Sequence, residues 1–146
     1  MKLKKQRSVT DCPCGGKAFA TCCAPLLSGA QQAVSAEQLM RSRYTAYTLA
    51  DDAYLRASWA AKTRPAPSTI SEAGVQWLGL DVRRHGEEGN EASVEFVARY
   101  KIDGRAYRLH EISRFVREDG CWYYLDGSFP EQIAPKSIAA RLKEDV

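Results

Sequence analysis

Four of the five cysteines in this chain lie within one short segment, CPCGGKAFATCC at residues 12–23. They form a Cys-x-Cys pair, Cys12 and Cys14, and a Cys-Cys pair, Cys22 and Cys23. A loop of seven residues separates the pairs, so the backbone must turn back on itself if the thiols are to meet. Thiols crowded in this way are typical of a disulfide staple, a redox dithiol or a metal cage.

The spacing favours a metal cage. A disulfide within either pair would be strained, because adjacent and Cys-x-Cys positions fit disulfide torsions poorly. Crossed bridges between the pairs need an oxidising compartment. The basic opening MKLKKQRS is not followed by the apolar run of a signal peptide, so we expect a cytoplasmic location, where disulfides are rare. A catalytic dithiol is more typically Cys-x-x-Cys near a βαβ unit. Structural zinc sites use four thiolates delivered as two close pairs, which this segment can supply.

Composition limits the remaining function classes. With 146 residues, 45% of them apolar, the chain can form one domain with a core that does not depend on disulfides. The net charge of +3 is too small to indicate nucleic-acid binding by itself. No apolar stretch approaches the length of a membrane span, so we expect no membrane association.

Helical signals begin after a polar connector at residues 28–35. Ser35 and Gln38 have capping-box spacing, and an apolar stripe with helical period follows at Met40, Tyr44 and Tyr47. Asp51 can cap a second helix, which must end before Pro65. A weaker cap signal predicts a third, short helix over residues 69–74.

The period then changes to that of β-strands. Four segments rich in β-branched and aromatic residues lie at 77–84, 91–101, 105–118 and 121–127. The separators EEGN, IDG and EDG are hairpin-type turn signals. Helices followed by an antiparallel meander predict an α+β fold.

These segments carry a resemblance to known families. CPCGGKAFATCC resembles the SEC-C motif, the zinc-binding tail first known from the preprotein translocase SecA. The chain beyond it is similar to the bacterial YchJ family in LMRSRYTAYTLADDAYL at 39–55, WLGL at 77–80 and SRFVREDGCWYYLDG at 113–127. The resemblance implies a zinc knuckle at residues 1–28 and a nuclear transport factor 2-like cone at 29–146. It also implies that one Zn²⁺ is bound by Cys12, Cys14, Cys22 and Cys23. Cys121 lies in the last expected strand, and we expect it to be a small buried hydrophobic residue and not a ligand.

Cones of this kind often hold a pocket between helix and sheet. Glu111 alternates with apolar neighbours in its strand, whereas His110 points to the opposite face and is expected at the surface or rim. We therefore expect Glu111 to be buried and to be paired with the first helix, which offers Arg41, Arg43 and Tyr44. A structural ion pair and a ligand-anchoring or catalytic acid both fit this pattern. No catalytic residue and no reaction can be read from the sequence.

Three functions remain open. The first is a protein-interaction module, because a complete ligand set leaves no coordination position to activate water. The second is small-molecule binding or catalysis in the cone, with Glu111 and an arginine of the first helix. The third is weak nucleic-acid contact through a basic N-terminus, formed by Lys2, Lys4, Lys5, Arg7 and Lys17.

Overall fold

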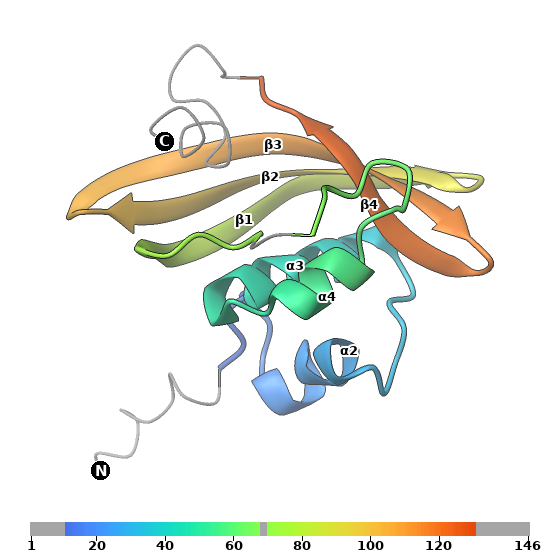
Figure 1. Ribbon diagram of the computed structural model, residues 1–146, viewed down its shortest axis with the longest axis horizontal. Helices are drawn as coiled ribbons and strands as arrows, with labels where there is room; N and C mark the ends of the chain where they lie inside the picture. Colours follow the sequence, from blue (N-terminus) through green and yellow to red (C-terminus); the bar gives the residue numbers. More distant parts are fainter. Residues whose placement is uncertain (1–10, 68–69, 131–146) are drawn as a thin grey trace.

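The computed structural model describes residues 11–67 and 70–130 of the chain. The elements in chain order are η2 (Phe19–Thr21), α2 (Ala24–Ser28), α3 (Ala36–Leu49), α4 (Asp52–Ala57), β1 (Val75–Glu88), β2 (Glu91–Ile102), β3 (Arg105–Glu118) and β4 (Cys121–Ser128). Figure 1 shows α3 and α4 across one face of a curved sheet, with α2 and the cysteine segment beyond the helices. None of the described helices is long and apolar enough to cross a membrane.

The first two predicted helices are present and start at their predicted caps. Oγ of Ser35 accepts a hydrogen bond from the Gln38 amide at 3.1 Å, and this bond opens α3. Oδ1 of Asp51 accepts from the Tyr54 amide at 3.1 Å and opens α4. Each cap satisfies a backbone donor that has no partner within the helix.

The prediction of a third helix is wrong over residues 70–74, where no residue is helical. Thr69, its predicted cap, lies outside the described residues. The amide of Ser71 instead donates to Oδ1 of Asp52 at 2.8 Å. A contact with the start of α4 therefore replaces the local helical pattern, which is how tertiary structure overrides a weak local signal.

All four predicted strands are present and form an antiparallel meander in the order β1-β2-β3-β4. β1 begins two residues before the predicted range and runs four residues past it. Asp103 and Gly104 both have positive φ, as do Asp119 and Gly120. This backbone is that of the type I′ turn, which matches the twist of the paired strands and explains the Asp-Gly signals.

One hydrophobic cluster joins the sheet, α3 and the cysteine segment. The inner face of the sheet contributes Val94, Phe96, Ala98, Tyr100, Leu109 and Phe115, and α3 contributes Leu39, Met40 and Tyr44. Cys12, Cys14 and Cys23 belong to the same cluster. The fold is α+β, as predicted, and α3 lies between the cysteines and the sheet (Figure 1).

Candidate metal centre and adjoining cavity

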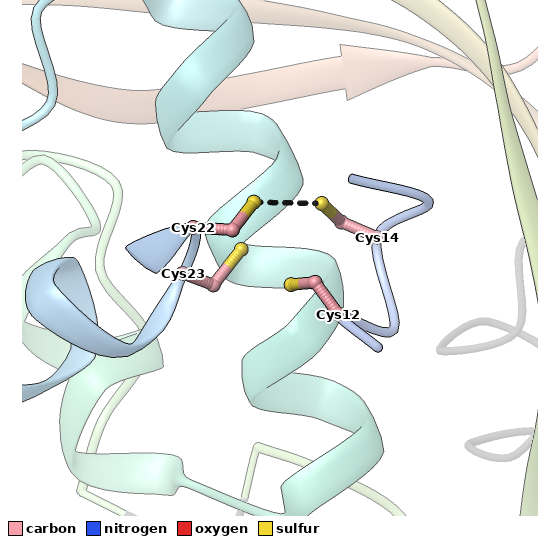
Figure 2. A group of neighbouring side chains, drawn as sticks. All are labelled: Cys12, Cys14, Cys22 and Cys23. Atoms are coloured by element: carbon pink, nitrogen blue, oxygen red, sulfur yellow. Dashed lines mark hydrogen bonds between the residues drawn. The ribbon is translucent and has the colours of Figure 1, made fainter. Parts of the chain in front are cut away.

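The four predicted ligands converge. Their Sγ atoms all lie within 4.8 Å of one another, and Figure 2 shows them facing one another beside α3. Sγ of Cys14 lies 3.6 Å from Sγ of Cys22, and all of these cysteines are free. The two sulfurs of a disulfide are bonded at about 2.05 Å. Zn–S bonds of about 2.3 Å place the sulfurs of a tetrahedron about 3.8 Å apart. The spacing therefore fits a metal ion and not a disulfide.

The glycine pair allows the first two cysteines to reach the second two. The Gly15 amide donates to the Cys12 carbonyl at 3.0 Å, and the Cys12 amide donates to the Lys17 carbonyl at 2.9 Å, which closes a tight loop. A Cβ atom added at Gly16 would lie 2.6 Å from Sγ of Cys22. Only glycine fits at that point without movement of the sulfur.

Helix α3 supplies polar contacts to the cage. Oγ1 of Thr45 donates to Sγ of Cys23 at 3.4 Å and lies 3.8 Å from Sγ of Cys12. Nη1 of Arg41 donates to the Cys14 carbonyl at 2.9 Å. These contacts orient both halves of the cage, in the way that groups around a metal's ligands usually do. The sequence did not indicate that Thr45 contacts the cage. The available signal was its spacing from Arg41, because residues four apart share one helix face.

Arg41 also extends this network to the sheet. Its Nε contacts Oε2 of Glu37 at 3.0 Å, and Oε1 of Glu37 contacts Nε2 of His85 in β1 at 2.9 Å. The Arg41 and Glu37 side chains are 31% and 27% exposed, so water screens their attraction and the pair adds little stability. Its effect is to fix the direction of the guanidinium.

The thiols differ in how readily they ionise. Hydrogen bonds from neighbouring groups, chiefly from Cys23, lower the pKa of Cys14 to about 5. Burial raises the pKa of Cys22 to about 12, and the hydrogen bond to Cys14 raises the pKa of Cys23. Cys22 and Cys23 thus hold their protons more tightly than Cys14 does. Bound thiols must be deprotonated, so a metal ion would displace these protons, and an all-sulfur donor set suits a soft divalent metal.

A second feature lies on the opposite side of α3. A cavity of about 130 Å³ separates the helix from the sheet. It is lined mainly by aromatic side chains, with a few apolar and polar ones, namely Tyr44, Tyr47, Trp59, Trp77, Phe96, Phe115, Tyr124, Phe129, Met40, Ala98, Leu109, Arg43, Glu111 and Ser113. Of the four residues predicted to form a pocket, Arg43, Tyr44 and Glu111 line this cavity. Arg41 does not, because its guanidinium faces the cysteine cage.

Glu111 is buried, as expected, with 8% of its surface exposed. Oε2 accepts hydrogen bonds from Oγ of Ser113 and from the Tyr124 hydroxyl, both at 2.9 Å. Burial raises the pKa of Glu111, while the two hydroxyl donors and the positive charge of Arg43 oppose this rise. No direct ion pair with Arg41 or Arg43 is formed within the described residues, so that expectation was wrong.

Arg43 bonds elsewhere. Its Nη1 donates to the Leu55 carbonyl at 2.8 Å and to Oγ of Ser58 at 2.6 Å, which ties α3 to the end of α4. The guanidinium carbon lies 5.1 Å from the ring centre of Trp59 and 4.6 Å from that of Tyr124. Stacking of this kind holds a cation against aromatic faces.

Two other residues lie apart from both features. His110 is half-buried on the outer face of the sheet, where its Nε2 contacts Oε2 of Glu95 at 2.7 Å. Cys121 is half-buried at the start of β4, and the cysteine group contains only the four residues named above. His110 lies on the face opposite Glu111, as expected, although its side chain is only 12% exposed, and Cys121 is less buried than expected.

A curved meander covered by helices, with a four-cysteine cluster against the first long helix, defines a nuclear transport factor 2-like protein with a SEC-C type cysteine motif. The family model described as "YchJ, middle NTF2-like domain" matches residues 35–127. The chain belongs to this family, the YchJ or UPF0225 family, as its sequence predicted.

Relatives and solved structures agree with this assignment. A UPF0225 protein of Ralstonia nicotianae is 52% identical over 128 residues, which cover 80% of this chain and 89% of the relative. A UPF0225 protein of Methylibium petroleiphilum is 51% identical over 124 residues, which cover 84% of this chain and 91% of the relative. The solution structure of RPA3114, a SEC-C motif containing protein from Rhodopseudomonas palustris, matches with a TM-score of 0.77 at 35% identity, covering 83% of this chain and 99% of that one. The crystal structure of a SEC-C motif containing protein from Psychrobacter arcticus matches with a TM-score of 0.71 at 22% identity, covering 97% of this chain and 99% of that one. This likeness supports the fold alone.

Proposed function

We propose that Cys12, Cys14, Cys22 and Cys23 bind one Zn²⁺ per chain as a closed structural site. The convergence of four sulfurs within 4.8 Å carries this proposal. Four protein ligands complete a tetrahedron and leave no position for a reacting water. The similarity to a SEC-C motif containing protein at 35% identity supports the same reading.

Elemental analysis of the purified protein tests the proposed zinc site. Purified wild type and Cys121→Ser should each contain one equivalent of zinc, whereas Cys14→Ser should lose most of it. Cys121→Ser is the matched control, because it removes a thiol outside the group. Absence of zinc from the wild type, or its loss from Cys121→Ser, would contradict the assignment.

We further propose that the knuckle docks a protein partner in the cytoplasm. The loop between the cysteine pairs supports this, because Gly15, Gly16, Lys17, Ala18, Ala20 and Thr21 are exposed while Cys12, Cys14 and Cys23 are buried. The metal would hold this loop rigid, and rigid loops bind at a lower entropic cost. No reaction is assigned to the site.

A surface variant separates docking from metal binding. Lys17→Glu combined with Ala20→Glu changes the exposed loop and leaves all four ligands in place. Affinity purification with this variant should lose a specific partner that the zinc-loaded wild type retains. Lys101→Glu, an exposed change on β2, is the control. Equal recovery with all three proteins would contradict docking through the loop.

Nucleic-acid contact stays the third prediction. Lys2, Lys4, Lys5 and Arg7 lie outside the described residues, and Lys17 is exposed. RNA that co-purifies with the protein and is released by moderate salt would support this function over the first.

Small-molecule binding in the cavity is a second candidate function. The observation that favours it is a buried carboxyl, Glu111, and a buried guanidinium, Arg43, in one aromatic-lined space of about 130 Å³. Pockets that combine an apolar wall with a few convergent polar groups are the usual form of ligand sites. Co-purification of a small molecule with the wild type would support this function, and its loss from a cavity-filling variant would locate it.

A further inference from the structure

Among the residues that the structure describes, no anion lies close to the charge of Arg43. Its side chain is buried, with 5% of the residue exposed. Only Nη1 has acceptors in the described part of the chain, namely the Leu55 carbonyl and Oγ of Ser58. Nε and Nη2 together carry three further N–H donors, and within the described residues no carboxylate lies within 4 Å of them. Buried guanidinium groups are normally paired with an anion.

Glu111 leaves one oxygen available on the same cavity wall. Both hydroxyl donors, from Ser113 and Tyr124, bind Oε2. Oε1 has no hydrogen-bond partner among residues 11–67 and 70–130. Because burial favours the neutral carboxylic acid, a proton on Oε1 would make it a donor. Arg43 thus offers donors to the cavity, and Glu111 offers one as well when it is protonated.

The cavity limits the size of the ligand. Its volume is about 130 Å³, and a protein cavity of about 150 Å³ accommodates benzene. Its walls are rings, including Tyr47, Trp77 and Phe96, which favour stacked and edge-on contacts with another ring. One six-membered ring with a small polar group fills this space, whereas a fused-ring compound exceeds it.

We infer that the cavity binds a small monocarboxylate with a single ring, whose carboxylate accepts hydrogen bonds from Arg43 and Glu111. The inference rests on the proposed small-molecule function and names its ligand class. The ligand's charge would supply the anion that residues 11–67 and 70–130 do not give to Arg43. A cationic ligand is disfavoured because Arg43 repels it, and a neutral amide of the same shape forgoes the charge-assisted hydrogen bond.

Titration of the zinc-loaded, full-length protein tests this inference. The three probes are benzoate, benzamide and benzylammonium, which share the ring and differ in charge. Chemical-shift changes of the indole N–H signals of Trp59 and Trp77 report binding at the cavity. Benzoate should bind about tenfold or more tightly than benzamide, since hydrogen bonds to charged groups are about twice as strong as neutral ones. Benzylammonium should not bind.

Two variants make the result specific. Ala98→Met fills the cavity without changing a charged group and should abolish benzoate binding, whereas Ala57→Met, on the exposed side of α4, should not. Arg43→Gln should remove the preference for benzoate over benzamide. Thermal unfolding of each variant shows whether it is folded. If Arg43→Gln does not fold, the comparison of Ala98→Met with Ala57→Met still tests the inference.

The outcomes separate the two claims. Equal affinity for benzoate and benzamide overturns the anionic ligand and leaves small-molecule binding standing. Absence of binding by all three probes overturns the single-ring ligand, and the co-purification experiment then decides small-molecule binding separately. Unchanged benzoate binding by Ala98→Met overturns the placement in this cavity.

Discussion

The hydroxyl of Thr45 donates a hydrogen bond to Sγ of Cys23 at 3.4 Å, which joins the middle of α3 to the cysteine cage. The neighbouring residues Arg43, Tyr44 and Tyr47 line the cavity on the side of the sheet. A single helix therefore positions both features, and changes on one of its faces can be compared with changes on the other.

Thr45→Val should weaken metal binding. Valine has nearly the same shape but cannot donate to the sulfur, and loss of such a supporting contact typically costs 10- to 100-fold in metal affinity. Competition with a chromophoric chelator measures the affinity. Thr48→Val is the matched control, because the Thr48 hydroxyl donates only to the Thr45 carbonyl. An equal effect of the two variants would show that Thr45 acts through the helix and not through the thiolate.

Gly16→Ala should also disturb the cage. The new Cβ would lie 2.6 Å from Sγ of Cys22, so the sulfur or the loop must move. Forcing an extra methyl group into a packed site costs about 1–3 kcal/mol, which here corresponds to about five- to 150-fold in zinc affinity. Gly86→Ala is the control, because nothing lies within 4 Å of the added atom. Unchanged zinc affinity in Gly16→Ala would mean that Sγ of Cys22 lies farther from residue 16 than described.

Glu111→Gln should change how stability depends on pH. The pKa of Glu111 in the folded protein is raised by burial, so its favourable contribution is complete below the unfolded pKa of about 4.3 and is lost as pH rises through the folded pKa. Glutamine does not titrate. The free energy of unfolding of the variant minus that of the wild type should thus rise above pH about 4.3, by up to about 1.4 kcal/mol per pH unit. Urea unfolding across pH 4–8 measures this difference, and a constant value would contradict the raised pKa.

Removal of zinc should loosen the knuckle and leave the sheet folded. The described part of the knuckle has one aromatic residue, Phe19, which is half-buried, whereas Tyr100 and Phe115 of the sheet are almost fully buried. So small a segment buries too little apolar surface to fold without its metal. Hydrogen exchange of the chelated, reduced protein should show lost protection at residues 11–28 and retained protection in β2 and β3.

Loss of exchange protection in the strands as well as in the knuckle would contradict this prediction. Cys12, Cys14 and Cys23 share a hydrophobic cluster with Leu39 and Met40. If the strands lose protection together with the knuckle, this shared cluster makes the chain one cooperative unit, and the division into residues 1–28 and 29–146 does not describe its stability.

The sequence predicted what depends on local spacing. The four ligands were predicted from two close cysteine pairs. The burial of Glu111 followed from the two-residue period of its strand, which places it on the face of Leu109 and Ser113. The caps at Ser35 and Asp51 followed from local donors and acceptors.

Contacts between distant segments could not be predicted in this way. Tyr124 reaches Glu111 across β3 and β4, whose register shifts between Arg114 and Phe115. Arg41 bonds the Cys14 carbonyl, 27 residues earlier in the chain. Both pairings depend on how the elements pack, so spacing within one element did not reveal them, and the expected Glu111–arginine ion pair was wrong for this reason.

The central claim is that the four cysteines bind one zinc ion as an all-sulfur site. X-ray absorption at the zinc edge of the purified, full-length protein tests it most directly, because the method reports the number, type and distance of the ligands. We expect four sulfur neighbours at about 2.3 Å. A coordination shell that contains nitrogen or oxygen at about 2.0–2.1 Å would contradict the closed cage.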